Sequence, residues 1–94
     1  MRLKGLNCIV TGGSSGIGAA TVKRFVEEGA HILIADIDID TANSFAEEMG
    51  SSVEAIKCDV RIESDVKAVS DHAYKTWGKV DVLVNNAGSE LNQT

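Results

Sequence analysis

Three glycines, Gly12, Gly16 and Gly18, stand between a short apolar run and a stretch with helical periodicity. Glycine between a strand and a helix lets the backbone approach a phosphate closely, and the first N–H groups of the helix point at the anion. The spacing T-G-x-x-x-G-x-G has a longer first gap than the usual dinucleotide fingerprint G-x-G-x-x-G. The loop predicts a phosphate cradle, and the alternative is a Gly/Ser-rich turn that binds no ligand.

Asp36 favours a dinucleotide as the ligand. It ends the second apolar run, about 20 residues beyond the loop, where a carboxylate can accept hydrogen bonds from both ribose hydroxyls. The same charge would repel the 2′-phosphate of NADP, and neither the loop nor positions 37–39 carry an Arg or Lys that would attract it. We therefore predict that NAD is preferred over NADP. The alternative for Asp36 is an ordinary solvated carboxylate at a strand end.

The elements that must position these groups alternate between strand-like and helix-like patterns. Apolar runs too continuous for one-sided burial predict four parallel strands, and the helical patterns between them predict helices on both faces. Right-handed crossovers place the first three strands in the order 3-2-1, and a fourth strand on the other side of the first gives the expected order 3-2-1-4. The predicted fold class is α/β, a Rossmann-type doubly wound parallel sheet in three α/β/α layers. The expected strands are 7–10, 31–35, 53–58 and 80–84, and the expected helices are 17–28, 40–49 and 62–77.

Single residues mark the ends and edges of these elements. We expect Asp40 to cap the second helix, Gly50 to end it, and Gly78 to end the third helix. Glu54 and Lys57 interleave the third strand, which is typical of a sheet edge.

The composition fits one small domain. The 94 residues are 44% hydrophobic and 24% charged, and the net charge is −5. An acidic chain lacks the basic face that non-specific nucleic-acid binding requires. We expect no membrane partner and no secretion signal, because no apolar run approaches the ~20 residues of a membrane span and the first residues do not form a signal peptide. Cys8 and Cys58 have no metal-ligand spacing, so we expect free buried thiols in a reducing, cytoplasmic compartment.

A carboxylate series resembles a calcium loop only superficially. Asp36, Asp38, Asp40 and Glu47 match ligand positions, but Thr41 stands where the sharp turn needs glycine. A strand also precedes the series where a helix is required, so we expect no metal site.

Three motifs together resemble the short-chain dehydrogenase/reductase family. They are T-G-G-S-S-G-I-G at 11–18, C-D-V at 58–60 and N-N-A-G at 85–88, and they span essentially the whole chain. The resemblance implies hydride transfer between a nicotinamide cofactor, NAD, and an alcohol or ketone, and a whole protein that is a homo-oligomer. The implied cofactor-binding residues are Gly12, Ser14, Ser15, Ile17, Gly18, Asp36, Ile37, Asp59, Val60, Asn86, Ala87 and Gly88.

The resemblance also implies what some of these residues do. Asp59 would bond the adenine amino group, the Val60 backbone would read the ring edge, and Ile37 would pack near the adenosine. Asn85 would brace the sheet, while the rest of its segment would lie along the cofactor's ribose and phosphates. Arg61 departs from the small polar residue common after this Asp-Val pair.

The family's catalytic residues are missing from the sequence. They are an Asn, a Ser and a Tyr-x-x-x-Lys pair that follow N-N-A-G, whereas the single tyrosine, Tyr74, precedes it and has Gly78 four residues on. Tyr74 is expected to be a half-buried aromatic of the third helix. We therefore expect residues 1–94 to be the truncated N-terminal part of one NAD-binding domain, without catalytic residues and inactive alone. The fourth strand, which has no partner for its outer edge, favours the same interpretation.

Two other functions stay open. A non-catalytic truncated paralogue would bind nucleotide or a partner subunit. A methyltransferase-type Rossmann half would also carry a glycine loop and an acid after the second strand, although the N-N-A-G segment disfavours it.

Overall fold

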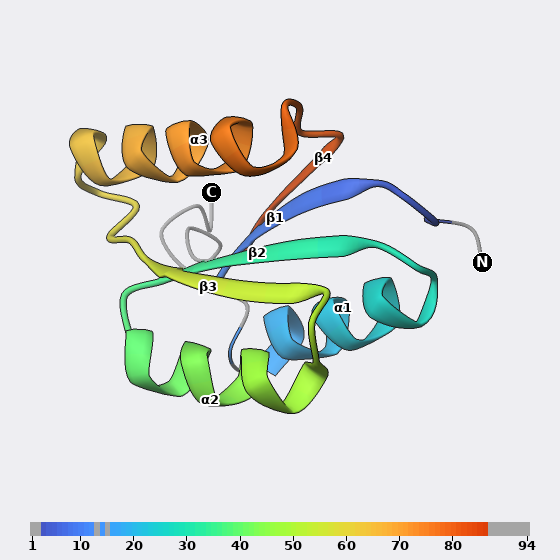
Figure 1. The fold of residues 1–94 in the computed structure, drawn as a ribbon. Helices are drawn as coiled ribbons and strands as arrows, with labels where there is room; N and C mark the ends of the chain where they lie inside the picture. The colour runs from blue at the N-terminus through green and yellow to red at the C-terminus, as the bar shows by residue number, and fades with distance from the viewer. Residues whose placement is uncertain (1–2, 13, 15, 87–94) are drawn as a thin grey trace, which may run out of the picture.

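Within residues 3–12, 14 and 16–86, which the computed structural model describes, the chain forms a four-stranded parallel sheet between helices. The elements are β1 (Asn7–Thr11), α1 (Gly16–Glu27), β2 (His31–Asp36), α2 (Ile39–Met49), β3 (Val53–Lys57), α3 (Glu63–Trp77) and β4 (Val82–Asn85). Helices α1 and α2 cover one face of the sheet and α3 covers the other (Figure 1). The strand order is β3-β2-β1-β4 with parallel pairing throughout, so the predicted fold class is confirmed.

The sheet carries an apolar core on each face. Ile32 and Ile34 of β2 pack with Val22 of α1 under α1 and α2, whereas Leu33 and Val69 lie in the core under α3. Successive residues of a strand point to opposite faces, and both faces are covered, so all of β1 is buried. The apolar runs of the sequence therefore mark central strands, and β3, which is less buried, lies at the sheet edge as predicted.

Both cysteines are free and buried, as predicted. Burial, reinforced by the negative charge of Asp81, raises the pKa of Cys8 to about 11. Burial also raises the pKa of Cys58. Each thiol is therefore protonated near neutral pH and behaves as a small apolar core residue.

The prediction that Asp40 caps α2 is wrong, because Asp38 holds that position. Its Oδ1 accepts the backbone N–H of Thr41 at 3.2 Å, and its Oδ2 accepts the Thr41 hydroxyl at 2.7 Å. An N-cap side chain reaches the free N–H three residues on, and only Asp38 has that separation from Thr41. Asp40 lies inside the first turn, where its charge suits the helix dipole.

Two expectations for the second half of the chain also need correction. The fourth strand begins at Val82 rather than at residue 80. Before it, the Asp81 carboxylate accepts the backbone N–H of Asn7 at 2.8 Å, so a side chain replaces the ladder acceptor at that point. Tyr74 is 55% exposed rather than half-buried, because α3 turns Val69 and Ala73 toward the sheet instead.

Among the helices that the structure describes, none combines the length and the apolar character needed to cross a bilayer.

Candidate functional site

The carboxyl ends of β2, β1 and β4, which are neighbours in the sheet, form one edge of the sheet. Thr11 at the end of β1 stands opposite Ala35 on one side and Asn85 on the other. The N–H of Gly12 then donates to the carbonyl of Ala35 at 2.8 Å, which fixes the start of the glycine loop against β2. In open α/β sheets, ligands bind in the crevice outside these strand ends, where the strand order reverses. Here that reversal lies between β1 and β4.

The glycine loop has the backbone that a phosphate cradle needs. Gly12 and Gly16 adopt positive φ values of 66° and 55°, a region that other residues rarely enter. Helix α1 begins at Gly16, and no acidic residue lies in its first turn to neutralise the positive end of the dipole. Gly18 is buried, whereas the Ile17 side chain is exposed at the start of the helix. Gly12 and Gly16 therefore place no side chain between a ligand and the backbone of the loop.

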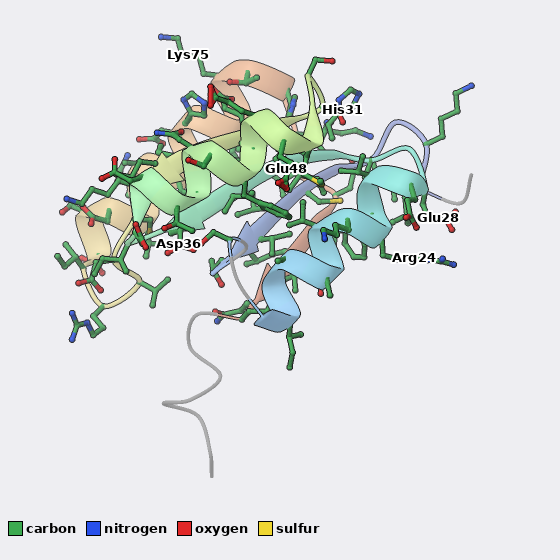
Figure 2. The ribbon with its side chains drawn as sticks, turned by 90° about the horizontal axis from the view of Figure 1, so that it is seen from below. Arg24, Glu28, His31, Asp36, Glu48 and Lys75 are labelled. Carbon is green, nitrogen blue, oxygen red and sulfur yellow. The ribbon has the colours of Figure 1, made fainter. Side chains whose placement is uncertain are left out.

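Asp36 is tied to the glycine loop. The Ser14 hydroxyl donates to its Oδ2 at 2.5 Å, and the backbone N–H of Asp38 donates to its Oδ1 at 3.0 Å. The residue is only 9% exposed, and it lies at the opposite end of β2 from His31 (Figure 2). A carboxylate offers about four acceptor positions, so each oxygen can accept one more hydrogen bond. A pair of neighbouring hydroxyl groups matches that capacity.

Asn85 and Asn86 form the β4 side of the edge. The Thr11 hydroxyl donates to Asn85 Oδ1 at 3.0 Å, a bond that joins β4 to β1. The side-chain nitrogen of Asn86 is buried and has no hydrogen-bond partner among the described residues. A buried N–H₂ group without an acceptor is costly in free energy, so Asn86 needs an acceptor that the described residues do not supply.

A second group of residues surrounds Asp59, in the turn between β3 and α3. Arg61 donates to both carboxylate oxygens of Asp59, through Nε at 3.0 Å and Nη2 at 2.8 Å, and its backbone N–H adds a third bond at 2.9 Å. These hydrogen bonds, and to a lesser extent the charge of Arg61, lower the pKa of Asp59 to about 2. Asp59 also lines an open hollow of about 510 Å³. The hollow is lined by Ile37, Lys57, Asp59, Ile62 and Asp65.

The structure thus places the predicted site residues along one edge of the sheet. Ser14 and Asp36 are joined by a hydrogen bond, and Gly12 bonds to Ala35, the residue before Asp36. Ile37 and Asp59 share a hollow. Val60 and Asn85 line a neighbouring hollow of about 280 Å³ between the sheet and α3. The predictions for Ser15, Ala87 and Gly88 lie outside the described residues.

Sequence reasoning missed Lys57 and Ile62 as residues of the Asp59 hollow. Lys57 is the register partner of Asp36 across β2 and β3, so aligning the parallel strands would have found it. Ile62 precedes α3 and is 47% exposed. Its spacing from Val66 and Val69 is helical and favours a place on the apolar face of the helix. The sequence carries no signal that Ile62 belongs to the hollow.

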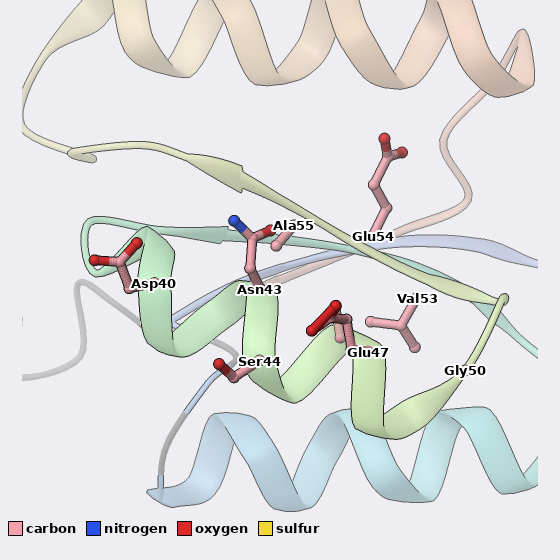
Figure 3. A pocket seen from close by; sticks show the side chains of 9 residues that line it. Asp40, Asn43, Ser44, Glu47, Gly50, Val53, Glu54 and Ala55 are labelled. Carbon is pink, nitrogen blue, oxygen red and sulfur yellow. The ribbon is translucent and has the colours of Figure 1, made fainter.

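A larger hollow, of about 730 Å³, lies away from this edge and has a different character. It runs between α2 and β3, with Asp40, Asn43 and Glu47 on the helix and Glu54 on the strand (Figure 3). It is open to solvent, and none of the described residues of the glycine loop lines it. Within the described residues, no group of three or more His, Cys, Asp or Glu side chains is arranged to hold a metal ion.

Known proteins share this sequence and this arrangement. A profile of the short chain dehydrogenase family matches residues 7–94. Short chain aldehyde dehydrogenase 1 of Euphorbia lathyris is 47% identical over 89 residues, which cover 93% of this chain and 31% of that protein. Momilactone A synthase of Oryza sativa subsp. japonica is 44% identical over 88 residues, which cover 93% of this chain and 32% of that protein.

A solved structure is also similar to this chain in fold and in sequence. The 3-ketoacyl-(acyl-carrier-protein) reductase from Brucella melitensis, complexed with NADH, superposes with a TM-score of 0.83 at 38% identity, over 86% of this chain and 33% of that one. The chain therefore spans about a third of the length of the relatives that it matches.

Proposed function

The chain belongs to the short-chain dehydrogenase family, and on that premise we propose that it forms the NAD-binding part of an oxidoreductase that acts on an alcohol or ketone. The observation that carries this proposal is the Asp36 carboxylate, held beside the glycine loop by Ser14 with capacity for two more hydrogen bonds. When bound, the nicotinamide ring would supply the hydride acceptor or donor.

The residues present fit such a cofactor. The first turn of α1 would hold the pyrophosphate with backbone N–H groups, and Gly12 would let the chain approach it closely because it has no side chain. Asp36 would bind the adenosine ribose. Ile37 and Asp59 would contact the adenine. The unpartnered Asn86 nitrogen supports a ligand with acceptor oxygens at this edge, and we extend that role to Ala87 and Gly88.

The cofactor preference is proposed from charge. Asp36 would repel a 2′-phosphate, which favours NAD over NADP. Lys57 stands opposite Asp36 in register and is the residue from which attraction for that phosphate would come. Because Asp36 itself is tied to the loop by Ser14, we expect its charge to dominate.

Equilibrium binding of NAD and NADP tests the proposal. With the protein expressed from its complete reading frame, we expect NAD to bind at least about tenfold more tightly than NADP, a difference of about 1.4 kcal/mol. Asp36→Ser should weaken NAD binding by a similar factor and reduce the preference, because the ribose loses its acceptors. Asp40→Ser removes an exposed carboxylate from α2 and should change neither the affinity for NAD nor the preference over NADP. Equal binding of both dinucleotides would contradict the NAD preference, and binding of neither would contradict the function.

Catalysis by the whole protein is proposed to depend on residues outside positions 1–94, because the chain has no Tyr-x-x-x-Lys pair. We expect the product of the complete reading frame to oxidise or reduce members of an alcohol and ketone panel with its cofactor, and residues 1–94 alone to do neither. The change in NADH absorbance at 340 nm measures the activity of both proteins in either direction. Turnover by residues 1–94 would contradict this division, whereas NAD binding without turnover by the complete product would favour the non-catalytic paralogue.

We also propose that the whole protein is a cytoplasmic homo-oligomer. The family resemblance supports the assembly, and the protonated buried thiols support a reducing compartment.

A further inference from the structure

Arg61 contacts a residue of the proposed cofactor site without lining the hollow itself. The Arg61 side chain is 69% exposed, whereas the Asp59 side chain that it contacts is 14% exposed. A side chain this exposed ordinarily gains little from an ion pair, because solvent screens the charges and the side chain loses entropy. The geometry here is better than that of an ordinary surface pair, because the guanidinium contacts both carboxylate oxygens at once.

The turn is held from a second direction as well. The backbone N–H of Asp59 donates to Asp65 Oδ2 at 3.0 Å, and Asp65 lies in the first turn of α3. The Asp59 main chain is thus fixed to α3 while its carboxylate is fixed by Arg61. Rotation of the carboxylate about its terminal bond would break at least one of the three hydrogen bonds from Arg61.

Arg61 does not occupy every hydrogen-bond acceptor position of the Asp59 carboxylate. Among the residues that the structure describes, Oδ1 accepts two hydrogen bonds, from the backbone N–H and the Nε of Arg61, whereas Oδ2 accepts one, from Nη2. Each carboxylate oxygen can accept about two hydrogen bonds, so the remaining position is on Oδ2. The hollow that Asp59 lines also contains the apolar side chains of Ile37 and Ile62. An ionised acceptor that shares a hollow with two apolar side chains suits a flat ring that donates one N–H.

We propose that Arg61 is a positioning residue that leaves Asp59 a single oriented acceptor, and that this acceptor selects adenine over a purine with an oxygen at the same ring position. The inference rests on the proposed function. Adenine presents an amino group there, which donates to a carboxylate, whereas hypoxanthine presents a carbonyl oxygen, which the carboxylate repels. Because the pKa of Asp59 lies at about 2, the carboxylate has no proton to offer that carbonyl at ordinary pH.

The test compares the affinities of NAD and nicotinamide hypoxanthine dinucleotide, which differ at this ring position. Equilibrium binding is measured with the protein expressed from its complete reading frame, and circular dichroism checks that each variant is folded. In the unchanged protein we expect NAD to bind about tenfold or more tightly than the hypoxanthine analogue, as for a charged hydrogen bond. Arg61→Thr should reduce this ratio to about threefold or less, because Asp59 keeps only its backbone bond from residue 61 and can rotate.

Two further variants separate positioning from charge and from general destabilisation. Arg61→Lys keeps the charge but cannot contact both oxygens with a planar fork, so it should resemble Arg61→Thr. Arg24→Thr is the matched control, because Arg24 lies on α1 near Glu28, away from the Asp36 end of the sheet, and should leave the ratio unchanged (Figure 2).

Each outcome bears on a different part of the proposal. A merely structural role for Arg61 would weaken both dinucleotides equally, and an unchanged ratio in Arg61→Thr would overturn the inference while the proposed function stands. If Arg61→Lys keeps the full ratio of the affinities for NAD and the hypoxanthine analogue, the planar contact of Arg61 is not what positions Asp59. If neither dinucleotide binds to the unchanged protein, both the inference and the proposed function are overturned.

Discussion

At the scale of single residues, the Asp38 cap couples the start of α2 to pH. The hydrogen bond from the Thr41 hydroxyl, followed by that from the Thr41 backbone, lowers the pKa of Asp38 below its ordinary value of about 3.9. A carboxyl group whose pKa is depressed by folding stabilises the native state above its ordinary pKa. That contribution is lost as the pH falls through the lower, native value.

We therefore predict that Asp38→Ala lowers the melting temperature by a few degrees at pH 7, because α2 loses its cap. The difference from the unchanged protein should shrink as the pH falls below about 3.9 and through the lowered pKa of Asp38, where the carboxylate becomes protonated. Thermal unfolding followed by circular dichroism measures both effects. Asp38→Asn is the control, since asparagine caps helices without titrating in this range. A difference that stays constant with pH would contradict the assignment of the cap.

Residues of the site differ in how far the sequence predicts them. Asp36 could be placed because strand length and loop position both depend on local patterns. The contact of Arg61 with Asp59 could not, because it depends on side-chain conformations in a turn, for which sequence spacing gives no rule. The structure adds that the departure from the common small residue after Asp-Val produces an ion pair.

At the scale of elements, the sequence predicts the seven helices and strands and their order, because each carries a strong apolar pattern. The parallel order β3-β2-β1-β4 also follows, since right-handed crossovers leave few alternatives. The residues at which helices and strands begin and end are harder to predict from the sequence. Asp38 and Asp40 are both good capping residues in sequence, and only the position of Thr41 over Asp38 decides between them.

Helix α3 shows a second limit of pattern reasoning. Its spacing predicts one apolar stripe that includes Ile62, Val66, Val69 and Ala73, but only the last two are buried. The apolar stripe exists, but the number of its residues that become buried depends on the width of the surface packed against the helix. That width is a property of the tertiary structure, which the spacing does not give. Here Val66 is 45% exposed and lines the hollow between the sheet and α3 together with Thr11 and Ala35.

At the scale of the whole molecule, an apolar surface surrounds β4. Leu83 is 64% exposed, and with Tyr74 and Val80 it lines a shallow hollow between β4 and α3. Within the described residues, β4 pairs only with β1. An exposed apolar strand at a sheet edge is a template for association.

We predict that residues 1–94, produced alone, self-associate through this surface. Leu83→Lys should raise the concentration at which association begins by about tenfold, as expected when one leucine side chain no longer becomes buried. Size-exclusion chromatography with light scattering measures the mass. Ala20→Lys, which places the same charge on the exposed side of α1, is the control. A monomeric, cooperatively unfolding 94-residue chain would contradict the prediction and would also show that these residues form an independent domain.

The register of β1 and β2 has a consequence for how this protein can change over evolutionary time. Ala35 stands beside Thr11, and Asp36 follows it on the opposite face of the sheet. Loss of one residue from β2 would carry the carboxylate to the α3 side, away from Ser14, even if every apolar contact were repaired. The number of residues in β2 is therefore under a constraint separate from their identity. Substitutions can accumulate in its core, whereas insertions and deletions belong in the turns at the far end, where they leave Asp36 in place.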